Sequence, residues 1–440
     1  MRRHVSSSNS IRADGSLWFL GVFLALMMLP AAGWAQSTLA FRGGTVITVT
    51  GSPIEGGVVL VRDGKIIAVG KDVSIPADAA IVETRGKFVM PGLVDAMTHF
   101  GIRPFNLNSQ EQVTPENRAV EAYYPFGDFF KGKGGVEADN ELLYGGVTTV
   151  YIAPGSTQLI GGQGAVVKTC GASYDGLILR DPASIDMALP PRPPREGTPP
   201  GRMAAMALLR KTMIGAQEYD RRVREYNEKS DDDKKDAEKP PRDMANEALQ
   251  RLLHRELPAR VEADFVEDIT AAMRLAEEFG FNLIIDSGIA AYQLKEVLAQ
   301  KKIPVVVGKI SHPFAPEYFT YPQELHSIAD ERNAAWLTRA GVKVAIASYA
   351  SSFGGKATQG RWLLIEAALA TAYGMSEEDA LKAVTINAAE ILGVDGRVGS
   401  IEPGKDADLI ILDGPPLGLK TWVERVYIDG TLAYQRGGRN

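Results

Sequence analysis

The sequence predicts an α/β protein, a (β/α)8 barrel of the TIM type with a small β-sandwich composed of N-terminal and C-terminal strands. Strand-like and helix-like segments alternate through the middle of the chain, which favours a parallel sheet. Short strands precede Pro91 and others follow Asp406, and neither group is large enough to build a core alone. A length of 440 residues accommodates one barrel and a smaller satellite domain.

The alternation is clearest between residues 146 and 373. Helix 265–279 has apolar residues at helical spacing, and Gly280 supplies its stop. The expected strands are 146–152, 259–263, 282–286, 304–307 and 342–346, and the other expected helices are 292–298, 334–340 and 361–373. Repetition of this kind over this length is typical of an eight-stranded barrel.

The two ends of the chain predict the satellite domain. Residues 58–62 and 66–69 form a hairpin through Asp63-Gly64-Lys65, and residues 408–413 and 423–429 are strands near the C-terminus. We therefore expect residues 36–90 and 395–440 to form two halves of one β-sandwich around a barrel of residues 91–394.

One insertion, residues 190–258, interrupts the barrel. Residues 190–200 are too rich in proline for a helix or a strand, which predicts an extended loop. Residues 229–242 are dense in charge and are expected to form a solvated loop. Helices over 203–227 and 244–256 flank that loop, so we expect a helical hairpin.

The first 35 residues are typical of a secretory signal peptide. Three arginines precede an apolar run over 17–29, and Gly33-Trp34-Ala35 follows with small residues at the cleavage positions. An uncleaved membrane anchor is the alternative, but the run is shorter than the ~20 residues that span a bilayer. We therefore expect cleavage near Ala35, a periplasmic or secreted protein, and no stable membrane span afterwards.

The composition of the mature chain excludes some partners. Removal of three arginines and one aspartate with the signal peptide changes the net charge from −6 to about −8. This balance does not favour binding to nucleic acid or to an anionic membrane. The lone Cys170 excludes an internal disulfide.

The segment Pro91-Gly92-Leu93-Val94-Asp95, followed by Met97 and His99, resembles the first barrel strand of the amidohydrolase superfamily, whose pattern is P-G-[LI]-[IV]-D-x-H-x-H. Residues 58–70 and 385–414 resemble the flanking sandwich segments of the same superfamily, in its imidazolonepropionase-like branch. The resemblance covers the mature chain. It implies a barrel hydrolase acting on carbon–nitrogen bonds other than peptide bonds, with one or two divalent metals that activate water.

The resemblance also implies metal ligands at particular strand ends, and most of these positions have changed. The superfamily places two histidines after strand one, a lysine or glutamate after strand four, histidines after strands five and six, and an aspartate after strand eight. The corresponding residues here are Met97 and His99, Glu262, Asp286 or Ser287, and Ser348-Tyr349. Lys168 is an outside candidate for the strand-four lysine, although exposure at the surface is favoured for it.

His99, Glu262 and Asp286 are therefore the candidate ligands of one zinc ion, and Asp286 and Glu262 are also the candidate catalytic residues. A thioether is a poor ligand for zinc-like ions, so Met97 is expected only to fill space. Each candidate has a structural alternative: a hydrogen-bonded histidine for His99, an ion pair with Arg260 or a loop lysine for Glu262, and a helix N-cap for Asp286. The site is expected to hold one divalent metal or none.

Three further histidines lie elsewhere in the mature chain. His312 and His326 belong to the loop after the seventh strand and either reach the site or lie on the surface. His254, in the insertion, is expected to be exposed.

These observations leave three functions open. The first is a carbon–nitrogen hydrolase with a rebuilt site. The second is a catalytically inactive homologue that binds a small ligand or pairs with an active paralogue, which a barrel mouth filled by Met97 and Tyr349 would favour. The third is a carbohydrate or peptide binder that uses Tyr318, Phe319 and Tyr321. A small-molecule substrate or ligand is expected in the first two cases, as is a homo-oligomer or a pairing with an active homologue.

Overall fold

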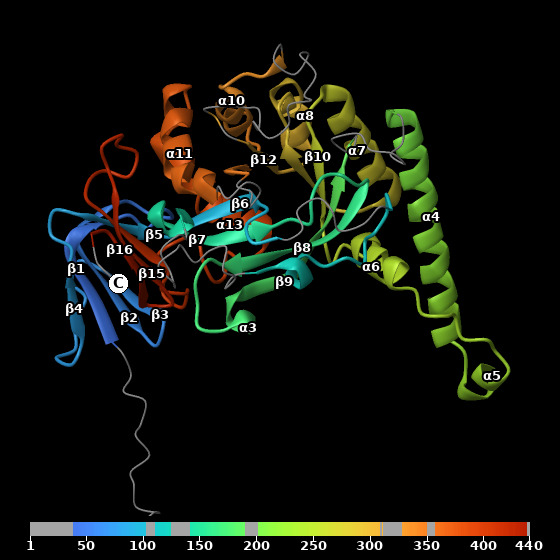
Figure 1. The fold of residues 1–440 in the computed structure, drawn as a ribbon, viewed down its shortest axis with the longest axis horizontal. Helices are drawn as coiled ribbons and strands as arrows, with labels where there is room; N and C mark the ends of the chain where they lie inside the picture. Colours follow the sequence, from blue (N-terminus) through green and yellow to red (C-terminus); the bar gives the residue numbers. More distant parts are fainter. Residues whose placement is uncertain are drawn as a thin grey trace, which may run out of the picture. The chain divides into compact units, whose positions relative to one another are not determined.

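The structure, a computed structural model, describes residues 38–102, 111–124, 141–189, 201–308, 310, 328–349 and 357–437. The predicted signal peptide, the proline-rich segment 190–200, His312, His326 and the aromatic residues 318–321 lie outside these segments. The described strands form two eight-stranded sheets, one of which is the barrel (Figure 1).

The first sheet contains strands from both ends of the chain. Its strands are β1 (Thr38–Val46), β2 (Ile54–Arg62), β3 (Lys65–Gly70), β4 (Ala80–Glu83), β5 (Phe88–Pro91), β14 (Leu409–Leu412), β15 (Val423–Ile428) and β16 (Thr431–Gln435). They are ordered β16-β15-β14-β5-β1-β2-β3, with β4 beside β1. The two ends join where β5 pairs antiparallel with β14, and Met90 lies opposite Ile410. The prediction that both termini share one sheet is confirmed.

The second sheet is an almost closed barrel. Its strands pair in chain order: β6 (Leu93–Thr98), β7 (Val147–Ile152), β8 (Ile160–Lys168), β9 (Ile178–Ala188), β10 (Ala259–Ala263), β11 (Leu283–Ser287), β12 (Val305–Val307) and β13 (Val344–Ile346). Just beyond β13, the N–H of Tyr349 donates to the carbonyl of Met97 at 3.1 Å, which brings the last strand to the first. The predicted barrel is therefore confirmed.

The barrel departs from a fully parallel sheet at β8, which runs antiparallel to both β7 and β9. Only residues 153–159 and 169–177 connect these three strands, whereas a parallel crossover takes a dozen residues or more. The glycine-rich run within β8 conceals this strand in the sequence. A Cβ atom at Gly164 would overlap the hydroxyl end of Tyr151, so the close approach of that ring requires glycine.

Helices cover the barrel as the periodicity predicted. They are α7 (Val266–Phe279), α8 (Lys295–Gln300), α10 (Asn333–Arg339), α11 (Leu363–Ala372), α12 (Glu377–Ala383) and α13 (Ile386–Leu392). Helix α7 buries Ile269, Met273 and Ala276, and Gly280 ends it with φ of 77°. The short elements are α2 (Glu141–Tyr144), α3 (Tyr174–Leu177), η2 (Ala119–Ala122), η3 (Ala291–Leu294) and η5 (Ala357–Trp362).

The insertion contains the two predicted helices, α4 (Arg202–Asn227) and α6 (Met244–Leu253). The charge-dense run between them includes the short helix α5 (Asp231–Lys235), at the end of α4 that extends away from the barrel (Figure 1). No residue of α5 is buried, which confirms that this run is solvated. Among the helices described here, none combines the length and the apolar character needed to cross a bilayer.

Candidate active site

The candidate residues lie where barrel strands end. Met97 and His99 are at the end of β6, Glu262 is near the end of β10, and Asp286 is near the end of β11. The parallel register pairs Glu262 with Asp286. Side chains alternate between the two faces of a strand, so Arg260 shares the face of Glu262 and belongs to the barrel interior.

Arg260 crosses the barrel interior and binds Asp286. Its Nε donates to Asp286 Oδ2 at 2.8 Å, its Nη2 donates to Asp286 Oδ1 at 2.6 Å, and Nη2 also donates to the carbonyl of Ala96 at 2.8 Å. The guanidinium lies 3.9 Å from the ring centroid of Tyr151. Burial opposes the charge of Arg260, but Asp286, Tyr151 and Asp186 together outweigh this effect and raise the pKa of Arg260.

This geometry decides between two interpretations of Asp286. Both of its carboxylate oxygens accept hydrogen bonds from Arg260, and the residue is only 2% exposed. The following helix η3 has Ala290 at its N-cap and no side-chain cap, so the alternative of an N-capping Asp286 is wrong. The expected alternative for Glu262 is an ion pair with Arg260, but the bidentate partner of Arg260 is Asp286.

A second carboxylate, Asp186 of β9, is also buried in the barrel. The hydroxyl of Tyr151 donates to Asp186 Oδ1, and the hydroxyl of Ser184 donates to the same oxygen at 2.8 Å. Burial raises the pKa of Asp186 to about 7, against the opposing attraction of Arg260. The sequence analysis missed this residue. The alternation of Ser184 and Asp186 with apolar neighbours, typical of a strand, was the available signal.

His99 is buried beyond the end of β6, with 3% of its surface exposed. Its Nδ1 lies 3.1 Å from the carbonyl oxygen of Ala153. Burial lowers the pKa of His99 to about 4, against the effect of the Ala153 carbonyl, so the imidazole is neutral at pH 7.

The position of the expected strand-eight aspartate is held by Ser348. Its N–H donates to Asp95 Oδ1 at 3.0 Å, and its hydroxyl donates to Asp95 Oδ2. Met97 is 4% exposed and packs in one apolar cluster with Tyr349. Ser348, which binds the Asp95 carboxylate, and Met97 and Tyr349, which fill space, thus lie at the carboxyl-terminal strand ends, where the amidohydrolase superfamily activates water.

Lys168 lies at the end of β8 and is fully buried, so the preference for surface exposure is wrong. Its Nζ lies 2.9 Å from Asp406, 3.0 Å from Asp408 and 2.5 Å from Asp429. A buried ammonium group needs such carboxylates to offset its lost hydration. Lys168 therefore ties the barrel to the segment around β14 and β15.

His254 is exposed, as predicted. Its Nε2 lies 3.2 Å from Asp220 Oδ1 in the helical insertion. This histidine belongs to the insertion and not to the ends of the barrel strands.

Comparisons with known proteins agree with this architecture. The crystal structure of an amidohydrolase from Thermotoga maritima MSB8 superimposes with a TM-score of 0.78 at 35% identity, over 90% of this chain and 100% of that protein. The chain belongs to the amidohydrolase superfamily. The model of the amidohydrolase family matches residues 257–433.

Curated amidohydrolase relatives match more distantly. Amidohydrolase tasK from Hapsidospora irregularis is 25% identical over 86% of this chain, and the match spans only 40% of the length of tasK. Imidazolonepropionase from Mesorhizobium japonicum is 24% identical over 82% of this chain and 87% of its own length. Both matches agree with membership of this superfamily.

A divalent metal, usual in this superfamily, does not fit the described residues. Within the described segments, no group of three or more His, Cys, Asp or Glu side chains could hold a metal ion, so His99, Glu262 and Asp286 do not form one. Asp286 is neutralised by a guanidinium, whose positive charge also repels a nearby cation. Met97 offers a thioether, which suits soft metals and not zinc-like ions.

Proposed function

We propose that this chain is a non-hydrolytic, metal-independent member of the amidohydrolase superfamily. It keeps the barrel as a scaffold that binds a small molecule or supports an active paralogue in the same exported compartment. Superfamily membership and the retained barrel support the scaffold, and the changed strand ends support the loss of hydrolysis.

One observation carries the proposal: Arg260 occupies both carboxylate oxygens of Asp286. A carboxylate that binds metal or takes a proton from water needs a lone pair directed at that group. The corresponding position at the end of β13 is held by Ser348, whose hydroxyl donates to Asp95. A hydroxyl of ordinary acidity does not accept a proton from water at neutral pH.

The test combines elemental analysis of the purified mature protein with a hydrolysis screen of cyclic amides and dipeptides. We expect zinc well below one ion per chain and no turnover, with or without added zinc. Stoichiometric zinc together with hydrolysis that both a chelator and Glu262→Gln abolish would overturn the proposal.

A second function, metal-independent hydrolysis of a carbon–nitrogen bond, is favoured by Asp186. This buried carboxyl group has a pKa of about 7, which suits a general acid or base at neutral pH. Any hydrolysis found in the screen should then be lost in Asp186→Asn and retained in the exposed control Asp395→Asn. Turnover that survives Asp186→Asn removes this second candidate.

A further inference from the structure

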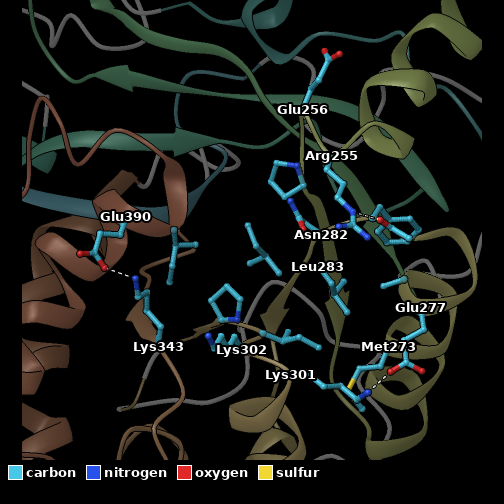
Figure 2. A pocket seen from close by; sticks show the side chains of 18 of the residues that line it. Arg255, Glu256, Met273, Glu277, Asn282, Leu283, Lys301, Lys302, Lys343 and Glu390 are labelled. Carbon is cyan, nitrogen blue, oxygen red and sulfur yellow. Dashed lines mark hydrogen bonds and ion pairs between the residues drawn. The ribbon is translucent and has the colours of Figure 1, made fainter.

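A cavity of about 1010 Å³ opens at the amino-terminal ends of the barrel strands, away from the strand ends that carry the candidate active site. Its wall includes the residues directly before β10 and β13, Pro258 and Lys343, and the turn before β12, Lys301 and Lys302. Figure 2 shows Glu390 of α13 on one side of this space and Met273 of α7 on the other. Its volume reaches the upper end of the roughly 300–1,000 Å³ range of small-molecule sites.

The carboxylates of the wall are already neutralised. Each wall carboxylate pairs with one cation: Glu277 with Lys301, Glu390 with Lys343, and Glu256 with Arg251 (Figure 2 draws the first two pairs). These pairs leave no net negative charge at the cavity.

Three more cations line the same cavity: Arg180, Arg255 and Lys302. Among the described residues, none of them has a carboxylate at ion-pair distance. Arg180 Nη1 donates to the carbonyl of Leu392 at 2.9 Å, and Arg255 Nε donates to the carbonyl of Gly280 at 2.5 Å. Each guanidinium therefore keeps further N–H groups for another acceptor.

Arg180 is the most telling of the three. It is partly buried, and burial, with repulsion from Arg251, lowers its pKa. A Cβ atom at Gly393 would overlap the Arg180 guanidinium, so only glycine at position 393 leaves room for the Arg180 side chain. A partly desolvated cation without a counter-ion is costly, and a bound anion would offset that cost.

Two of the turns around the cavity have a lysine or an arginine at a position of positive φ, where glycine is the usual residue. Near the cavity, five of the turns that follow helices have a residue with positive φ: Arg255, Gly280, Lys302, Gly341 and Gly393. Arg255 at 61° and Lys302 at 55° adopt the left-handed conformation despite their side chains. A cation near a helix C-terminus gains from the helix dipole, and Arg180 shares this gain because its Nη1 donates to Leu392, the last residue of α13. The helix end carries only a partial negative charge, so the guanidinium still lacks a full counter-charge.

We propose that this cavity binds a small organic anion, whose phosphate or carboxylate groups are held by Arg180, Arg255 and Lys302. Guanidinium groups donate paired N–H bonds to such oxyanions, and the lysine supplies a third charge. The apolar part of the wall, from Met273, Phe281 and Ile303, contacts the carbon skeleton of the ligand. This site lies at the opposite ends of the strands from Asp286 and does not depend on the proposed function.

The test is isothermal titration calorimetry of the mature chain at low ionic strength. The probes are citrate, glucose 6-phosphate and inorganic phosphate, with neutral glucose as the uncharged control. Citrate and glucose 6-phosphate distinguish carboxylate from phosphate recognition, and inorganic phosphate reports whether the skeleton contributes. We expect one organic anion to bind with 1:1 stoichiometry and more tightly than inorganic phosphate, and glucose not to bind.

Two lysine variants decide where the anion binds. Lys302→Gln should weaken binding roughly tenfold, because a charge-assisted hydrogen bond is lost. Lys71→Gln removes the same charge from an exposed position outside the cavity and should leave the affinity unchanged. Lys302 makes no hydrogen bond or ion pair with another described side chain, so Lys302→Gln is expected to fold normally. Absence of binding by all three anions, or equal weakening by both variants, would overturn the proposal.

Discussion

Arg260 and Asp286 form a two-pronged ion pair inside the barrel, with Nε to Oδ2 at 2.8 Å and Nη2 to Oδ1 at 2.6 Å. Arg260 is 1% exposed and Asp286 is 2% exposed, so each charge depends on the other for compensation. The pair joins β10 to β11, and the additional bond from Arg260 to the Ala96 carbonyl reaches β6. A single guanidinium thus links strands from different parts of the barrel.

Replacement of Arg260 by methionine should destabilise the protein by about 3–5 kcal/mol, because it leaves the Asp286 carboxylate buried without a counter-charge. Urea unfolding at pH 7 measures the effect. Addition of Asp286→Leu to Arg260→Met should recover much of the loss, since both charges are then gone. The control Arg210→Ala breaks an exposed pair with Glu278 and should cost about 1 kcal/mol or less. Equal losses from Arg260→Met and Arg210→Ala would contradict this interpretation.

The fold was predictable where one periodicity dominated. Helix 265–279 was predicted because its apolar residues repeat at helical spacing. Strand 282–286 was predicted because its apolar residues form a short run that ends at a polar residue. Strands β8 and β9 were both missed, and β8 was missed because Gly161, Gly162 and Gly164 resemble a loop in isolation. Only the approach of Tyr151 to Gly164 explains a strand there, and that contact depends on the assembled barrel.

The site was less predictable, because its pairings depend on the stagger of strands. The sequence indicated His99, Glu262 and Asp286 as candidates but did not show that Asp286 faces Arg260. Lys168 is the clearest error. Its partner Asp408 lies 240 residues away, so its local sequence carries no sign of burial.

Lys168→Met should destabilise the protein by about 3–5 kcal/mol, because it leaves Asp408 buried without its ammonium partner, whereas Asp406 keeps Lys65 and Arg397. The loss is measured by chemical denaturation at pH 7. The matched control Lys382→Ala removes a lysine paired with Glu378 within α12 and should cost about 0.5 kcal/mol or less. If both variants unfold at the same denaturant concentration, Lys168 does not stabilise the junction of barrel and sheet.

The raised pKa of Asp186 predicts a pH dependence of stability. Its folded pKa is about 7 and its ordinary value is 3.8, so the folded protein holds the proton more tightly. The associated stability is fully present below pH 4 and is lost as the pH rises through 7. This loss amounts to at most about 4 kcal/mol, from three pKa units.

Asp186→Asn should remove that loss, so the free energy of unfolding should fall less between pH 5 and pH 8 than in the unmodified protein. The free energy is measured by urea unfolding at intervals across this range. Asp395→Asn, at an exposed position, should keep the original dependence. A parallel fall in the unmodified protein and Asp186→Asn would show that another group is responsible.

The N-terminal segment predicts a processed protein. Expression with export should yield a mature chain that begins at Gln36, because the apolar run over 17–29 and the small residues up to Ala35 suit signal peptidase. Intact mass spectrometry of the exported protein measures this. Replacement of Leu24 by arginine within the apolar run should retain the unprocessed chain, whereas Ser8→Ala should have no effect. Retention of residues 1–35 in the exported protein would favour the membrane-anchor alternative.

Zinc should not change the melting temperature of the purified protein, and a chelator should not lower it. A ligand that binds only the folded state at 100 times its Kd stabilises by about 2.7 kcal/mol, which a thermal scan detects readily. The Arg260 guanidinium already satisfies Asp286, and the nearby positive charge disfavours a second cation. Arg260→Gln is the informative variant, since it frees Asp286 beside Glu262. A zinc-dependent increase that appears only in Arg260→Gln would show that the guanidinium excludes the metal, whereas an increase in the unmodified protein, reversed by chelator and lost in Glu262→Gln, would establish a metal site in the native chain.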